Sequence, residues 1–475
     1  MLLRHYTKKR SSLSLCEIDP SNKIRLIKKY CSNGTNEGTL FSKNIYLTDP
    51  VVKKMTFKSS NRSFIASPTS KSRTKIYVPI KKPDFLRSMS DPDFVEQFYK
   101  NLIISSEIIE FHHGNNRKNH INSKTEALRN ILLLVEDIKS IEKMPYENIC
   151  RVFDMCMFNI MRSFPEDNPS FFLLEEVPLA KESSWEHIEI CYKILLCLIK
   201  FCPNLSYFSI HFIRNLFLIS GTPDDDERAY IVQIIRVWLE YNHNSHGVFI
   251  QMCNWIIHQH CEGDIKPFHI RTIINIFVVG FKSLYKGPKS GAFSHIIRTS
   301  VFPLLSDKYS VFFYQVLADF ILSYLNINKN DSLSLINRIM MYWPHSKTTS
   351  QTICIVLLAE AAKNLHKDHL CMVVRRIILI ISSCLESYNS RVIESTGNSI
   401  LSNEFSSILK LDIECVKSCL LPIARKTSKE HWSEKARAIS ENIASNLEML
   451  IKDNPNLIKD NGKSKKSGIT WNDLL

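Results

Sequence analysis

Most of the chain repeats apolar residues at spacings of three, four and seven, the pattern of one face of an α-helix. Two of these stripes are Phe94, Phe98, Leu102 and Ile109, then Leu128, Ile131, Leu132 and Val135. The pattern predicts further helices over 149–164, 185–201, 210–219, 230–241, 248–260, 270–281, 295–305, 311–325, 332–342, 352–365 and 370–385, with several more up to residue 451. Strand-like alternation is nearly absent, so the sequence predicts an all-α fold.

Prolines in the polar breaks between these segments suggest a repeat. Pro223, Pro267, Pro303 and Pro344 follow one another at steps of 44, 36 and 41 residues, and each interval holds two helical segments. A unit of about 40 residues with two helices is the HEAT or armadillo period. We therefore predict an α-solenoid of HEAT/armadillo-like helical repeats over residues 79–453, a scaffold of the kind that binds other proteins over a broad surface.

The ends of the chain have a different composition. Residues 1–78 are rich in Ser, Thr, Asn and Lys without apolar periodicity, which predicts a disordered tail. Residues 1–82 carry 18 Lys and Arg against 4 Asp and Glu, whereas the rest of the chain carries 43 of each, so the net charge of +14 belongs to this tail. Residues 454–475 are expected to form a polar C-terminal tail.

The basic tail has two interpretations. It is either a solvated segment without a specific partner or an arm that contacts nucleic acid, acidic lipid or an acidic protein. Nucleic-acid binding would be a property of the tail alone, because the repeat region is neutral, and the sequence as a whole does not favour it. No secretory signal and no uncharged apolar run of about 18 residues is evident, so we expect no membrane span.

Composition argues against an enzyme. Only 12 of 475 residues are Gly, against about 7% in ordinary chains, and glycine-rich phosphate-binding loops are missing. The 14 Cys are scattered without zinc spacing and are expected to be apolar core residues. Among the histidine pairs, only His366 and His369 have the i, i+3 spacing of helical ligands, and neither Cys nor a carboxylate cluster completes a metal site. We expect no cofactor and no metal.

Five segments, in order along the chain, resemble one protein family. They are MCMFNIMRSFPEDNP at 155–169, ESSWEHIEICYKILLCLIKF at 182–201, FIRNLFLISGTPDDDER at 212–228, MMYWP at 340–344 and KEHW at 429–432. Together they resemble the B-prime (B56) regulatory subunits of protein phosphatase 2A over about residues 91–453. The sequence also departs from the family, since Trp185 is followed by Glu186 rather than Pro and residues 285–289 form a short insertion. The chain therefore resembles a diverged member of this family.

The resemblance implies a function without catalysis. A B56-like chain would bind the scaffold and catalytic subunits of the phosphatase and select phosphoprotein substrates through short linear motifs, in the cytoplasm and also in the nucleus. The alternative is a generic helical-repeat adaptor with no phosphatase partner. The two differ in whether the chain co-purifies with phosphatase.

The resemblance also implies a peptide groove for the pattern Leu-x-x-Ile-x-Glu. Aligned with the family, Arg236 would pair with the acidic residue of the peptide, while Trp238, Ile273 and Phe277 would form the walls of the aliphatic pockets. Ile235 stands where the family has His, which removes one polar group. The alternative is that the three apolar side chains are only core and Arg236 is a surface residue.

A second candidate site is the run Asp224, Asp225, Asp226, Glu227 and Arg228. It is expected at the tip of a loop within a repeat, where the resemblance implies a contact with the catalytic subunit. Three successive carboxylates suit a contact with basic residues of a partner. The alternative is an ordinary solvated loop.

Overall fold

The computed structural model describes residues 91–109, 118–162, 181–286, 290–345 and 347–454, together with Pro83, Leu86 and Phe164. The predicted tails, 1–78 and 454–475, lie outside these residues except for Asn454. The chain divides into two compact units, residues 1–165 with 180–243, and residues 166–179 with 244–475. Each unit is described by itself.

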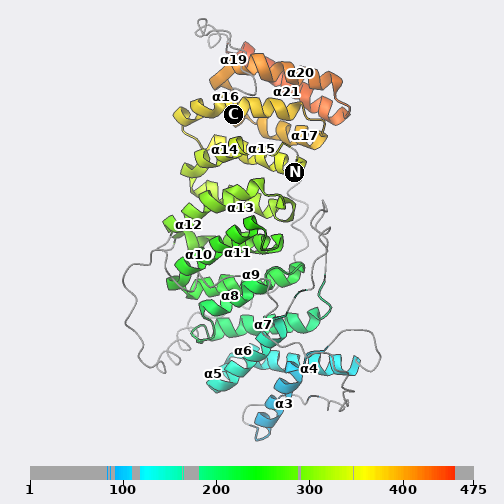
Figure 1. Ribbon diagram of the computed structural model, residues 1–475, viewed down its shortest axis with the longest axis vertical. Coiled ribbons are helices and arrows are strands. Elements are labelled where there is room, and N and C mark those ends of the chain that lie inside the picture. The colour runs from blue at the N-terminus through cyan, green and yellow to red at the C-terminus, as the bar shows by residue number, and fades with distance from the viewer. Residues whose placement is uncertain are drawn as a thin grey trace. The chain divides into compact units, whose positions relative to one another are not determined.

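The described residues of unit 1 form helices (Figure 1). They are α3 (Phe94–Ser106), α4 (Lys118–Glu136), α5 (Ile138–Lys143), α6 (Tyr146–Ile160), α7 (Trp185–Phe201), α8 (Ile210–Ile219) and α9 (Asp225–Tyr241). Helix α4 packs against α3 and α7, α6 packs against the same two helices, and α7 also packs against α9. Helices thus contact both their sequence neighbours and the equivalent helices of the next pair, as in a helical repeat.

Unit 2, taken by itself, has the same kind of helical arrangement with more repeats. Its α-helices are α10 (His246–Glu262), α11 (Pro267–Lys286), α12 (Ser290–Ile296), α13 (Tyr314–Ile327), α14 (Ser332–Met341), α15 (Thr348–Lys363), α16 (Lys367–Leu385), α17 (Ser390–Ile400), α18 (Asn403–Leu409), α19 (Ile413–Cys415), α20 (Leu421–Glu430) and α21 (Glu434–Lys452). Short 3₁₀ turns of unit 2 lie at Phe302–Ser306, Ser310–Phe312, Lys329–Asp331 and Lys410–Asp412.

The repeat of unit 2 has the predicted length. Helices α11, α13, α15, α17 and α21 begin 34 to 47 residues apart, and each packs against the next. Each unit is therefore a stack of helical repeats, and the prediction of an all-α fold with HEAT/armadillo-like repeats is confirmed. No strand occurs in the described part of the chain, and no helix there is long and apolar enough to cross a membrane.

Two π-helical segments interrupt the helices of unit 2, and both have the same cause. Ile297–Val301 and Val416–Leu420 are π-helical, and Pro303 and Pro422 follow two residues after each. Proline has no N–H to donate to the preceding turn, and its ring crowds the carbonyl four residues before it. The backbone adopts the wider turn there, so the helix predicted over 295–305 is divided into α, π and 3₁₀ parts.

Polar side chains and one glycine fix several helix ends. The side chain of Asn389 accepts from the N–H of Arg391 at 3.0 Å at the start of α17, and Ser433 caps α21 in the same way. Gly263 ends α10 with φ of 94°, and the N–H of Asp264 donates to the carbonyl of Gln259 at 2.9 Å. A side chain is disfavoured in that left-handed conformation, which explains glycine there.

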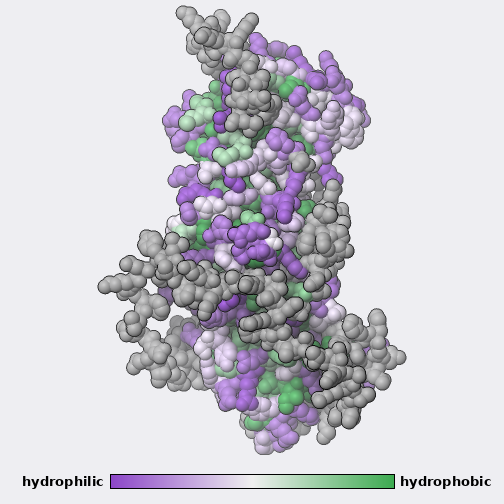
Figure 2. Space-filling view, in the orientation of Figure 1, coloured by the Kyte–Doolittle hydropathy of each residue, from purple (hydrophilic) through white to green (hydrophobic). Residues whose placement is uncertain are grey.

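The core of both units is aliphatic and aromatic. Of the twelve described cysteines, eight are buried, which confirms their interpretation as core residues, whereas Cys261 and Cys371 are exposed. The visible face of the described residues is mostly hydrophilic, with scattered apolar patches (Figure 2). Single exposed apolar side chains are ordinary on such a surface, whereas contiguous apolar patches mark candidate binding sites.

Candidate partner-binding surfaces

The acidic run is the start of a helix rather than the tip of a loop, so that part of the prediction is wrong. Asp224 is the N-cap of α9, and its side chain accepts from the N–H groups of Asp226, at 2.9 Å, and Glu227. The other oxygen of Asp224 accepts from the N–H of Glu182 at 3.0 Å. Acidic side chains are favoured in the first turn because they face the positive end of the helix dipole.

Only part of the run can reach a partner. Asp224, Glu227 and Arg228 are buried, and Arg228 bonds to the carbonyl of Thr222 and to Asp225. The side chains of Asp225 and Asp226 are exposed. A contact of the run with the catalytic subunit stays a prediction, and it now concerns these two carboxylates alone.

Glu227 belongs to a buried polar network in unit 1. Its carboxylate accepts two hydrogen bonds of 2.7 Å from Arg162, which follows α6, and one of 3.0 Å from the hydroxyl of Tyr192. Arg162 also donates to Glu182 at 3.1 Å. Burial opposes the charge of Arg162, but the hydrogen bonds and charge of Glu227 outweigh it and raise the pKa of the guanidinium. The network ties the end of α6 to the start of α9.

The unit 1 residues aligned with the peptide groove differ in accessibility. The Trp238 side chain is fully buried and donates from Nε1 to the carbonyl of Phe208 at 2.7 Å. Half of the Arg236 side chain is exposed, and its Nε lies 3.4 Å from Glu240 on the same helix. Arg236 is therefore available to an acidic ligand, whereas Trp238 is held in the core.

The other two groove residues, Ile273 and Phe277, lie on α11 in unit 2 and are also fully buried. The Phe277 ring packs edge-to-face against Phe293, with centroids 5.2 Å apart, and against Phe320. This burial agrees with the alternative that these residues are core. The peptide role stays a prediction, carried by Arg236.

Three aromatic side chains of unit 2 recur along its repeats, of which Tyr388 and Trp432 are exposed and Trp343 is half-buried. The segments MMYWP and KEHW contain Trp343 and Trp432, but the sequence did not predict a partner contact for either or select Tyr388. Trp343, Tyr388 and Trp432 occur 45 and 44 residues apart, each in a turn between the two helices of a repeat. Tyr388 is 89% exposed and Trp432 71% exposed, and the Trp432 indole donates to the carbonyl of Tyr388 at 2.8 Å. We call these three residues the aromatic row. The equal spacing was the available signal, but exposure could not be read from the sequence.

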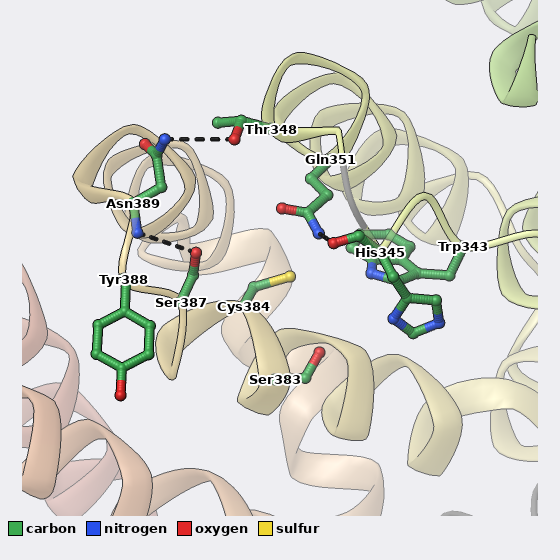
Figure 3. Close-up of a pocket in the computed structure, with 9 residues that line it drawn as sticks. All are labelled: Trp343, His345, Thr348, Gln351, Ser383, Cys384, Ser387, Tyr388 and Asn389. Carbon is green, nitrogen blue, oxygen red and sulfur yellow. Dashed lines mark hydrogen bonds between the residues drawn. The ribbon is translucent and has the colours of Figure 1, made fainter. Parts of the chain in front are cut away.

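Two hollows accompany the aromatic row. One, of about 400 Å³, is lined by Trp343, His345, Thr348, Gln351, Ser383, Cys384, Ser387, Tyr388 and Asn389 (Figure 3). The other, also about 400 Å³, is lined by Tyr388, Asn389, Ser390, Arg391 and Trp432. Since Tyr388 and Asn389 line both, the hollows adjoin.

Hydrogen bonds hold the turns around the first hollow. The Asn389 side chain donates to the hydroxyl of Thr348 at 3.3 Å, and its backbone N–H donates to Ser387 (Figure 3). Gln351 donates to the carbonyl of His345 at 2.9 Å. The aromatic side chains are thus presented from ordered turns, which lowers the entropy lost on binding.

The family of protein phosphatase 2A regulatory B subunits, the B56 family, matches residues 82–469. The chain belongs to the B56 family. The match includes the acidic run, the groove residues and the aromatic row, and it confirms the resemblance seen in the five sequence segments.

Several individual B56 proteins are similar to this chain. The mouse 56 kDa regulatory subunit alpha isoform is 22% identical over 336 residues, which are 66% of this chain and 65% of that protein. The human beta isoform is 22% identical over 341 residues, 67% of this chain and 65% of that protein. The Arabidopsis thaliana B' delta isoform is 22% identical over 345 residues, 66% and 69% of the two chains. The chain thus spans slightly less than two thirds of the length of its mouse and human relatives.

B56 proteins are regulatory subunits of the phosphatase, in agreement with the prediction that this chain is not an enzyme. In the described part of the chain, no three His, Cys, Asp or Glu side chains come together as metal ligands.

Proposed function

We propose that this chain is a non-catalytic regulatory subunit of protein phosphatase 2A, which binds the scaffold and catalytic subunits and selects phosphoprotein substrates. The observation that carries the proposal is the B56 match over residues 82–469, which takes in the helical repeats of both units. Metal-assisted phosphoester hydrolysis would take place on the catalytic subunit. This chain would hold the substrate near the catalytic subunit. The effective concentration of the substrate there would rise, although this chain has no active site of its own.

The aromatic row is the surface that we assign to the phosphatase core, the complex of scaffold and catalytic subunits. Large aromatic side chains exposed on ordered turns are uncommon on a surface without a partner and dominate binding energy when buried in an interface. Trp343, Tyr388 and Trp432 occur once in each of three repeats, so they can contact a long partner at several points. Asp225 and Asp226 would add a charged contact, which affects the rate and specificity of association more than affinity.

Substrate selection would use Arg236. A Leu-x-x-Ile-x-Glu peptide is expected to bind weakly, because Trp238, Ile273 and Phe277 are buried in the structure. Arg236→Glu should abolish that binding, since the new carboxylate repels the acidic residue of the peptide. Equal titration curves for the wild type and this variant would show that substrates are chosen by another surface.

The decisive experiment for assembly is reconstitution. Purified chain would be mixed with a purified dimer of the phosphatase scaffold and catalytic subunits, and the mixture separated by size-exclusion chromatography. The proposal expects a ternary complex whose activity toward a phosphopeptide belongs to the catalytic subunit. A chain that elutes alone at micromolar concentration would instead be the generic helical-repeat adaptor.

A further inference from the structure

Unit 1 contains an apolar groove that none of the sites above uses. It has a volume of about 470 Å³ and lies between α6, α8 and the turn before α8. Its lining consists of Phe153, Asp154, Met157, Phe158, Met161, Tyr207, Ser209, His211, Phe212 and Asn215. We call it the α6–α8 groove. Its size lies in the range of ligand pockets, about 300 to 1,000 Å³.

The floor of the α6–α8 groove is rigid and its walls are adaptable. Phe153 and Phe212 are buried with ring centroids 5.5 Å apart, and Tyr207 lies 5.0 Å from Phe153. Aromatic rings packed in this way keep their orientation. Met157 and Met161 stand at the walls, and methionine adjusts its shape to different apolar partners.

Two of the lining aromatic residues are accessible to a ligand. Phe158 is 43% exposed and Tyr207 is 37% exposed. Leu218, one helical turn beyond Asn215 on α8, is also exposed, so apolar surface continues past the groove. A contiguous patch of this kind is more characteristic of a binding site than single exposed apolar residues are.

The polar side chains of the groove indicate which charge its ligand carries. The side chains of Asp154, His211 and Asn215 make no hydrogen bond or ion pair with any other residue that the structure describes. Partial burial raises the pKa of Asp154, so its carboxylate is poorly solvated for an exposed group. A cation of the ligand would stabilise the charged carboxylate of Asp154, and the faces of Phe158 and Tyr207 also attract cations.

We propose that the α6–α8 groove binds a short segment of a partner polypeptide in which an aliphatic or aromatic side chain stands next to Lys or Arg. The apolar side chain enters between Phe158, Met157 and Phe212. The neighbouring cation pairs with Asp154 at the rim. Asn215 and His211 are placed to hydrogen-bond the peptide backbone. An acidic segment does not fit, because its charge would face Asp154.

The proposal does not require phosphatase assembly, so it can be tested on the isolated full chain. The probe is a fluorescein-labelled peptide, Gly-Ser-Lys-Leu-Arg-Phe-Ser-Gly, titrated by fluorescence anisotropy. Two companion peptides replace either Lys and Arg by Glu or Leu and Phe by Ser. The first peptide is expected to bind, and each companion is expected to bind at least tenfold more weakly.

Variants then assign the binding to the groove. Phe158→Ala should weaken binding about tenfold, which at 1.4 kcal/mol per decade is about 1.4 kcal/mol. Asp154→Asn should weaken it about fivefold, and less at high salt. The matched controls are Leu133→Ala on α4 and Glu96→Gln on α3, which remove an exposed apolar and an exposed acidic side chain outside the groove and should change nothing.

Three results would overturn the proposal. The first is equal binding of the basic and acidic peptides, and the second is an affinity unchanged by both Phe158→Ala and Asp154→Asn. The third is concentration-dependent self-association in sedimentation velocity that Phe158→Ala abolishes, which would assign the groove to a second copy of the chain. Melting curves of both variants should match the wild type, because the altered side chains are exposed.

Discussion

Gly397 of α17 lies so close to Ile439 of α21 that a β-carbon on the glycine would be 2.4 Å from the Cγ2 atom of Ile439. The two helices belong to successive repeats of unit 2 and pack directly against each other. The glycine therefore sets how closely these repeats approach, and a methyl group there has no space unless Ile439 or the helix moves.

We expect Gly397→Ala to destabilise unit 2 by about 1 to 3 kcal/mol, the usual cost of overpacking. Urea unfolding followed by circular dichroism would measure it. Gly291→Ala in α12 is the control, because a β-carbon there meets nothing within 4 Å and alanine favours a helix over glycine by up to about 1 kcal/mol. If the clash is the cause, Gly397→Ala combined with Ile439→Ala should cost less than the sum of the two. Additive effects would argue against it.

The pair formed by Arg162 and Glu227 gives a second prediction. Arg162→Met leaves the carboxylate of Glu227, which is fully buried, without its cation, and removing one partner of a buried pair costs about 3 to 5 kcal/mol. The double variant Arg162→Met with Glu227→Met should recover much of this loss. Arg129→Met, which breaks the exposed pair with Glu186, should cost no more than about 1 kcal/mol. Equal losses for the buried and exposed pairs would contradict the network.

His187 makes the stability of unit 1 depend on pH. Burial, with the neighbouring Lys124 cation, lowers the pKa of His187 to about 4 from an ordinary value of 6.5. Thr125 donates its hydroxyl to the carbonyl of Ile121, so its oxygen accepts from Nε2 of His187 at 3.0 Å. The ring is therefore a neutral donor in the folded protein.

The sign of the pH effect follows from the lowered pKa. The unfolded chain protonates His187 below about pH 6.5 and the folded protein only below about pH 4, so unfolding takes up a proton between these values. The free energy of unfolding should fall as the pH drops through this window, by up to about 1.4 kcal/mol per pH unit. His187→Gln should flatten this dependence. Parallel pH profiles for wild type and His187→Gln would refute the assignment.

The positions of the helices could be predicted well, because a helix that buries one face has apolar residues at spacings of three and four in its sequence. The segments predicted over 185–201 and 210–219 coincide with α7 and α8. The start of α9 was missed because the acidic run was interpreted as a loop, although Asp224 followed by three acidic residues is also the signature of a capped helix start. The π-helical segments depend on how proline is accommodated, which apolar spacing does not encode.

The candidate sites were harder to predict, because they depend on which side of a helix is covered. Trp238 and Arg236 are two residues apart on α9, yet one is fully buried and the other half exposed. Arg162 was not selected from the sequence, because its partner Glu227 is 65 residues away. Tyr388 likewise carries no motif of its own, and only its exposure identifies it.

The aromatic row gives the last prediction, which tests the assignment to the phosphatase core. Tyr388→Ala and Trp432→Ala remove exposed side chains, so the melting temperature should stay close to that of the wild type. If these side chains are anchors, each truncation should cost about 2 kcal/mol of binding, roughly a thirtyfold weaker ternary complex at 1.4 kcal/mol per decade. Met372→Ala is the matched control, since this α16 side chain is also exposed, lies outside both hollows and should leave assembly unchanged. The affinity of each variant for the scaffold–catalytic dimer can be measured by biolayer interferometry. Normal affinity of both aromatic variants would exclude the row from the interface and would leave the exposed carboxylates of Asp225 and Asp226 as the next surface to test.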